Sequence, residues 1–284
     1  MSRIVYVNGE WKPEAEATIS VFDRGLLFAD AIYEVTAVIN RKLIDYSGHT
    51  ARLKRSLEAL GIPSPVSDDE LLDLHRQIIE RNDLESGLIY LQISRGAADR
   101  DFLFADGMKP SIIMFTQKKN VLENPKWETG LSVVTVPEGR WANRQIKTVQ
   151  LLYSSMMKTE AAKAGADDVF LVEDGLITEA SSSNVHIVTK DGVLVTRHLS
   201  NALLHGITRA SVLSLAQGSD LEVEERAFSV AEVLSAAEVF ITSASAFVMP
   251  VVRVDGRSIG DGKPGPVSRK LLQTYIQDRL AHAI

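Results

Sequence analysis

Four stretches of the sequence carry side chains that could react or bind phosphate. The first runs from Asn143 to Leu152, "NRQIKTVQLL", and places Lys147 between Ile146 and Thr148. A lysine in such company is usually a surface residue whose stem lies along apolar side chains while its ammonium reaches water. A reacting amine must be neutral, however, and apolar surroundings favour the neutral form. Lys147 is therefore either a surface charge or a reactive amine at a strand end facing a cavity.

The second stretch, "LITEASSSNVHIV", places Glu179 before three serines and Asn184. Small residues there would let a flat molecule approach the backbone. A Ser-rich turn between two strands explains the same pattern, and on spacing alone it is the commoner reading.

The remaining two stretches could bind a phosphate. "LLHGITRASV" places Gly206, Ile207 and Thr208 at a predicted helix start, where free N–H groups and a hydroxyl suit an anion. "HTARLKRSL" places Arg52 on a helix, and a guanidinium can hold a phosphate through two parallel bonds. An ordinary helix entry and a solvated arginine are the simpler explanations of these two patterns.

Periodicity predicts the elements that must position these residues. In the first 118 residues we expect a hairpin at Asn8-Gly9, a strand pair from Leu26 with its turn at Asn40-Arg41, and two strands over 87–96 and 110–117. Helices are expected over 47–60, ended by Gly61, and from Ser67 onward, where acidic residues fill the first turn.

The second half of the chain continues this mixture. We expect a strand over 131–139, a helix over 149–165, three strands over 166–196, a helix from Gly206, a short helix over 229–237, a hairpin over 238–259 and a C-terminal helix. Strands and helices mix without strict alternation, which indicates an α+β fold. The aperiodic segment 120–128 is expected to link a small domain, 1–119, to a larger one, 129–284.

Composition excludes several classes of protein. The 284 residues have 45% hydrophobic side chains and a net charge of -6, which argues against nucleic-acid and anionic-membrane partners. No window approaches a membrane span, and the N-terminus lacks a signal-peptide pattern. The absence of cysteine excludes disulfides and thiolate chemistry and is compatible with a cytoplasmic location. Six scattered histidines offer no metal-ligand spacing.

The stretches described above, together with "DRGLLFADAIYEV" and "YLQISRG", occur in an order that resembles the fold type IV family of pyridoxal-5′-phosphate (PLP) enzymes. The resemblance runs from about Val5 to about Val254. It implies two domains, the larger with a barrel-like sheet, and a homodimer that binds PLP. Within the family the sequence is most similar to D-amino acid transaminases.

The resemblance implies a role for each candidate residue. Lys147 matches the lysine that binds PLP as a Schiff base and moves the substrate proton, and Glu179 matches the acid that pairs with the pyridine nitrogen. Such an acid keeps the ring protonated, so that the ring can withdraw electrons. Tyr33 and Arg100 match groups that bind the substrate carboxylate. The other expected cofactor contacts are Arg52, Ser182, Ser183, Asn184, Leu204, Gly206, Ile207, Thr208, Ser243 and Ala244.

The sequence departs from the family pattern at two positions. The block Arg-x-His is Arg100-Asp101-Phe102 here, so the histidine is absent and a carboxyl group is added. The two charged residues could instead form a solvated pair on a loop. Ala244 replaces a threonine whose hydroxyl would bind the phosphate, and its N–H or the neighbouring serines, Ser243 and Ser245, could substitute.

The expected activity is transfer of an amino group from a D-amino acid, such as D-alanine or D-glutamate, to a 2-oxo acid, with ping-pong kinetics. Alternatives within the fold are an (R)-amine or branched-chain transaminase and an enzyme like aminodeoxychorismate lyase. A PLP-binding carrier without turnover is the alternative outside catalysis.

Overall fold

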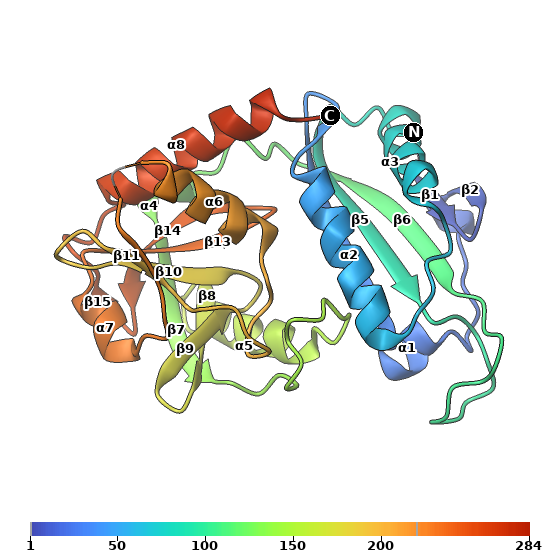
Figure 1. The fold of residues 1–284 in the computed structure, drawn as a ribbon, viewed down its shortest axis with the longest axis horizontal. Helices are drawn as coiled ribbons and strands as arrows, with labels where there is room; N and C mark the ends of the chain where they lie inside the picture. The colour runs from blue at the N-terminus through green and yellow to red at the C-terminus, as the bar shows by residue number, and fades with distance from the viewer. Residues whose placement is uncertain (1, 220) are drawn as a thin grey trace. The chain divides into compact units, whose positions relative to one another are not determined.

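The computed structural model describes residues 2–219 and 221–284, and none of the helices in that part of the chain is long and apolar enough to cross a membrane. The chain forms two compact units (Figure 1). Unit 1 comprises Met1–Leu122, Ile146–Gln150 and His282–Ile284, and unit 2 comprises Glu123–Gln145 and Leu151–Ala281. The lysine-bearing segment therefore packs with unit 1, although its neighbours along the chain belong to unit 2.

Unit 1 is built on a six-stranded sheet in the order β2-β1-β6-β5-β3-β4. The strands are β1 (Ile4–Val7), β2 (Glu10–Pro13), β3 (Ala31–Ile39), β4 (Lys42–Leu43), β5 (Ser86–Ser94) and β6 (Ser111–Lys118). All neighbouring pairs are antiparallel. The hairpins predicted at Asn8-Gly9 and Asn40-Arg41 are confirmed: all four turn residues have positive φ, as tight hairpin turns require.

The helices of unit 1 are η1 (Glu14–Glu16), α1 (Arg24–Phe28), α2 (Tyr46–Leu60) and α3 (Asp68–Arg81). α2 and α3 lie along the sheet (Figure 1) and contribute Leu53, Leu57 and Ile78 to its core. α3 starts with a capping box between Ser67 and Glu70.

The predicted strand from Leu26 is wrong at its start. Residues 24–28 form α1 because the Asp23 side chain caps the helix by accepting a hydrogen bond from the Gly25 N–H. The strand β3 begins only at Ala31.

Unit 2 contains a nine-stranded sheet in the order β12-β11-β10-β13-β14-β7-β8-β9, with β15 paired to β14. Its strands are β7 (Leu131–Pro137), β8 (Asp168–Glu173), β9 (Leu176–Ala180), β10 (Asn184–Val188), β11 (Leu194–Thr196), β12 (Val223–Glu225), β13 (Glu238–Ser243), β14 (Phe247–Val254) and β15 (Arg257–Ser258). β9 ends the sheet, yet only Ser181–Ser183 separate it from β10, which is third from the other end. A connection this short brings the two strands close together, so the sheet must curl into the barrel-like form that the family resemblance implies.

The helices of unit 2 are α4 (Lys126–Thr129), α5 (Leu152–Lys163), α6 (Ile207–Gln217), α7 (Val230–Ser235) and α8 (Pro266–Ala281). Two predictions need correction. Residues 166–196 form four strands rather than three, because the serine turn interrupts the stretch. The expected hairpin over 238–259 has a third short strand, β15.

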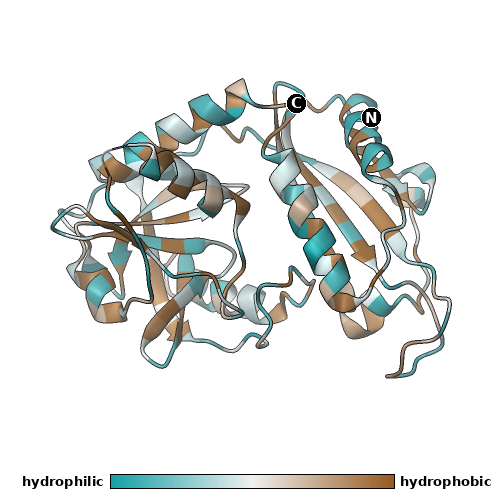
Figure 2. Cartoon of the chain, in the orientation of Figure 1, coloured by the Kyte–Doolittle hydropathy of each residue, from teal (hydrophilic) through white to brown (hydrophobic). Residues whose placement is uncertain are grey.

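Figure 2 shows hydrophobic residues concentrated on the strands of both sheets, whereas α2 alternates between hydrophobic and hydrophilic residues. Each unit has its own apolar core, with Ile32, Ile89 and Met114 fully buried in unit 1 and Phe170, Val195 and Val254 fully buried in unit 2. The architecture is α+β, as predicted.

Candidate functional site

Lys147 lies beside the first residues of β3 rather than at a strand end of its own. Its carbonyl accepts a hydrogen bond of 3.0 Å from the Tyr33 N–H, and its own N–H donates to Ser56 Oγ at 3.3 Å. The ammonium nitrogen lies 4.1 Å from the centroid of the Tyr33 ring. No salt bridge joins Lys147 to a carboxylate in the part of the chain that the structure describes. The amine is therefore held by its backbone and an aromatic face, without a counter-ion.

Arg52 is clamped by an acid that the sequence analysis did not single out. Glu34 Oε1 accepts from Arg52 Nε at 2.8 Å, and Glu34 Oε2 accepts from Arg52 Nη2 at 2.7 Å and contacts His49 Nδ1 at 2.8 Å. All three side chains are buried. Burial raises the pKa of Glu34, but the charge and hydrogen bonds of Arg52 and His49 outweigh it and bring the pKa to about 2. The guanidinium is thus fixed in orientation by an ionised carboxylate.

Tyr33 belongs to a row of stacked rings. Its ring centroid lies 5.6 Å from that of Tyr90, which in turn lies 4.7 Å from that of Phe115. Burial, with a smaller contribution from Tyr33, raises the pKa of Tyr90 to about 12. Tyr33 and Glu34 are consecutive on β3 and so point to opposite faces of the sheet.

Arg100 lies on the exposed loop between β5 and β6. Within the described residues, no hydrogen bond or ring contact joins it to Tyr33 or Lys147. The structure therefore does not bring the two expected carboxylate-binding residues together within this chain.

Glu179, near the end of β9, is a buried acid held by three hydrogen bonds. Its Oε1 accepts from Asn184 Nδ2 at 2.9 Å and from the Leu204 N–H at 2.8 Å, and its Oε2 accepts from Arg140 Nη1 at 2.6 Å. Asn184 also donates to the Leu204 carbonyl at 2.9 Å. Two other predicted residues, Asn184 and Leu204, are thus brought together around the Glu179 carboxylate.

Arg140 bridges Glu179 to a second acid, Glu138. The guanidinium donates to Glu138 through Nε at 3.0 Å and through Nη2 at 2.7 Å. Burial raises the pKa of both acids, but hydrogen bonds from Arg140 and Thr178 bring that of Glu138 down to about 2. The pKa of Glu179 stays above its ordinary value because the effect of burial outweighs the charge and hydrogen bond of Arg140, which lower it. Arg140 and the Leu204 N–H oppose this rise and favour the ionised form of Glu179, which is the form that accepts a hydrogen bond from a protonated ring nitrogen.

The N-terminus of α6 has the features of an anion site. Gly206 is its N-cap residue and makes no side-chain cap, and Thr208 in the first turn is buried. A Cβ on Gly206 would lie 2.0 Å from Asn184 Oδ1, so only glycine fits beside this amide. The helix start and the Glu179 network are therefore packed against each other.

The serine turn and the β13–β14 turn complete the picture of unit 2. Ser183 is buried and its carbonyl accepts from the Ala180 N–H, whereas Ser182 is exposed. Ser181 is buried and its hydroxyl has no hydrogen-bond partner among the described residues. Because Asn184 pairs with Thr242 in the sheet, the turn that begins with Ser243 and Ala244 lies at the same end of the sheet as the serines.

Sequence reasoning missed Glu34, His49, Glu138 and Arg140. One signal was available for Glu34, because it is the only charged residue in the apolar strand "AIYEVTAVI", and a charge at such a position needs a partner. Arg140 and Glu138 lie in the loop between β7 and α5, where charged residues are ordinary.

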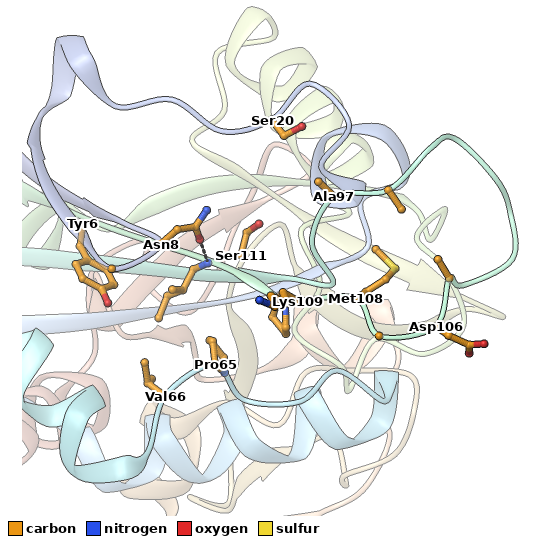
Figure 3. Close-up of a pocket in the computed structure, with 16 residues that line it drawn as sticks. Tyr6, Asn8, Ser20, Pro65, Val66, Ala97, Asp106, Met108, Lys109 and Ser111 are labelled. Carbon is orange, nitrogen blue, oxygen red and sulfur yellow. Dashed lines mark hydrogen bonds between the residues drawn. The ribbon is translucent and has the colours of Figure 1, made fainter.

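A separate cavity of about 800 Å³ lies in unit 1, between β1, the residues before α3 and the base of the loop that carries Arg100 (Figure 3). Its lining includes Tyr6, Val66, Met108 and Lys109 and none of the predicted site residues. It is therefore distinct from the candidate site.

Comparison with known proteins identifies the family. The family model for amino-transferase class IV matches residues 31–254. D-alanine aminotransferase from Bacillus licheniformis is 37% identical over 278 residues, with 97% of this chain and 96% of the relative covered. D-alanine aminotransferase from Staphylococcus aureus (strain N315) is 35% identical, with 99% of each chain covered.

Solved structures agree with this result. A branched-chain amino acid aminotransferase from Escherichia coli superposes with a TM-score of 0.92 at 25% identity, covering 98% of this chain and 95% of the other. A second enzyme of that name, determined with pyridoxamine 5′-phosphate, gives a TM-score of 0.89 at 25% identity, covering 98% of this chain and 94% of the other.

The chain therefore belongs to the class IV aminotransferases, and the predicted family, fold class and transaminase activity are confirmed. Enzymes of this class use PLP. The residues present fit that cofactor: unit 2 offers a buried carboxylate held by three hydrogen bonds, an uncapped helix start and an unpartnered buried hydroxyl. Unit 1 supplies an amine without a counter-ion.

Proposed function

We propose that this protein transfers the amino group of a D-amino acid, of the D-alanine or D-glutamate type, to a 2-oxo acid by ping-pong kinetics. The observation that carries the reaction is the Lys147 amine, held against the Tyr33 ring without a carboxylate partner. The choice of a D-amino acid is supported by relatives that are named D-alanine aminotransferases and are similar over nearly the whole chain.

PLP, when bound, supplies an aldehyde that links covalently to amines and a ring that withdraws electrons from the substrate carbon. Lys147 Nζ would hold the aldehyde carbon, and Glu179 the ring nitrogen. Arg52 and the start of α6 at Gly206, Ile207 and Thr208 would hold the phosphate, together with the turn at Ser243 and Ala244. Leu204, Ser182, Ser183 and Asn184 would lie beside the ring.

The chain's own residues then account for the proton transfer and for orientation. As a free amine, Lys147 Nζ would take the proton from the α-carbon of the amino acid and pass it to the cofactor carbon. Arg140 and Asn184 keep Glu179 in one orientation, so that its oxygens need not reorganise during the reaction. Tyr33 would bind the substrate carboxylate, which fixes the α-hydrogen relative to the base. We propose the same role for Arg100, although no contact joins it to Tyr33 within the described residues.

A second candidate is a transaminase for (R)-amines or branched-chain amino acids. It is supported by the similarity to solved branched-chain enzymes and by Phe102 at the position where the D-amino acid transaminase pattern has histidine.

We also propose a homodimer, because several large apolar side chains of unit 1 expose half or more of their surface. They are Val21, Phe22, Leu26, Phe102 and Leu103. A cysteine-free chain is compatible with the cytoplasm.

The reaction is tested with purified protein, added PLP, D-alanine and 2-oxoglutarate. Lys147→Ala should abolish turnover, whereas Lys270→Ala, at an exposed lysine of α8, should retain it. Normal turnover by Lys147→Ala would refute the role of this lysine. Turnover of L-leucine or an (R)-amine in place of D-alanine would establish the second candidate.

A further inference from the structure

The loop Asp99–Phe104 of unit 1 is organised by contacts between arginines and aromatic rings. The guanidinium carbon of Arg100 lies 5.5 Å from the ring centroid of Phe28 and 5.7 Å from that of Phe102. The two rings themselves meet edge to face at 5.6 Å. Arg100 is therefore in contact with two phenyl rings that also contact each other.

The backbone of this loop is anchored independently of Arg100. Arg24 Nη1 donates to the Asp101 carbonyl at 2.6 Å, and Arg24 is itself buried and bonded to Asp30 at 2.8 Å. Phe104 covers the guanidinium of Arg95 at 3.7 Å. Because both arginines are buried and fixed, the loop has a defined conformation on either side of Phe102.

Asp101 does not neutralise Arg100. Its Oδ1 accepts a hydrogen bond of 3.1 Å from the Leu103 N–H, which directs the carboxylate into the turn of its own loop. Within residues 2–219 and 221–284, no carboxylate oxygen lies within salt-bridge distance of Arg100. The solvated ion pair that the sequence allowed is thus absent from the described structure.

The guanidinium of Arg100 lies near two rings, and within the described residues none of its N–H groups donates a hydrogen bond, so these donors are available to another acceptor. We propose that Phe102, together with Phe28, is a positioning residue that holds Arg100 ready for the substrate carboxylate, in place of the histidine of the related pattern. This proposal rests on the proposed function. It makes the loop the feature by which the enzyme prefers amino acids to amines that lack a carboxylate.

Phe102 is suited to a test because its side chain is 78% exposed, so that its removal should not disturb the core. Phe102→Leu should raise the KM for D-alanine about threefold, the ratio expected for one exposed cation–π contact, with kcat changed by less than about twofold. The same variant should leave the KM for (R)-1-phenylethylamine unchanged, because that amine has no carboxylate. Leu103→Ala, at an equally exposed neighbour without a ring contact to Arg100, is the control.

A double-mutant cycle separates positioning from a general effect of the loop. In an Arg100→Met background, Phe102→Leu should have no further effect on the KM for D-alanine, and Phe102→His should restore most of the loss in the presence of Arg100. An unchanged KM in Phe102→Leu, or an equal effect in the Arg100→Met background, would overturn the proposal. A wild-type enzyme that uses only amines would instead overturn the proposed function.

Discussion

The buried pair of Glu34 and Arg52 makes a quantitative prediction about stability. The folded-state pKa of Glu34 is about 2, against an ordinary value of 4.5. This difference corresponds to a contribution of about 3 kcal/mol to the free energy of unfolding. Because the folded value is the lower one, the folded state favours the ionised acid. This stabilisation is fully present above about pH 4.5 and is lost as the pH falls towards 2.

Glu34→Gln keeps the shape of the side chain but removes its charge from beside the buried guanidinium. Breaking a buried pair in this way costs about 3–5 kcal/mol, so the melting temperature should fall by on the order of 10 °C at pH 7. Thermal melts of the variant and the wild type, followed by circular dichroism at several pH values, measure the difference. Glu58→Gln, at an exposed glutamate of the same helix as Arg52, is the control and should melt like the wild type.

The pH dependence distinguishes an ion pair from a packing effect. The difference between Glu34→Gln and wild type should shrink as the pH falls from 4.5 towards 2, because the wild-type acid becomes neutral as well. A difference that stays constant from pH 7 to pH 3 would show that shape, not charge, is responsible. No difference at pH 7 would refute the reasoning altogether.

Two further predictions concern unit 2. Arg140→Met removes the cation shared by Glu138 and Glu179 and should lower stability by about 3–5 kcal/mol. Denaturant melts should show a larger loss at pH 8 than at pH 5, because the two acids protonate more readily at pH 5. Arg253→Met, at an exposed arginine, is the control. An equal loss at both pH values would contradict the charge argument. Gly206→Ala should force Asn184 from its hydrogen bonds with Glu179 and Leu204 and weaken PLP binding, measured by fluorescence titration, with a stability cost of about 1–3 kcal/mol. Gly218→Ala, at the other end of α6, meets no atom closer than 3.5 Å and should bind PLP normally; equal PLP affinity in both variants would refute the steric argument.

Local features of this fold could be predicted from the sequence because neighbouring residues determine them. Asn8-Gly9 and Asn40-Arg41 adopt positive φ at their turns, and Ser67 with Glu70 caps α3. Each of these signals lies within a few residues of its effect. The resemblance to the family likewise depended on short blocks and their order.

The missed pairings of Arg52 and Glu179 depend on contacts between distant residues. Arg140 meets Glu179 across 39 positions, and Arg52 meets Glu34 across 18. Neither pairing leaves a periodic pattern. The backbone bond from Tyr33 to Lys147 spans still more of the chain. The sequence therefore predicted a strand end for this lysine and could not show that it lies beside β3.

The most direct test of the proposed activity is the visible spectrum of the purified protein with PLP, recorded before and after D-alanine, with L-alanine in a matched sample. We expect a yellow protein whose colour is bleached by the D-isomer alone, which would establish cofactor binding, the first half of the transfer and the stereochemistry together. A yellow protein that L-alanine bleaches and D-alanine does not would contradict the proposed substrate. A protein that stays colourless with added PLP would contradict the role of Lys147.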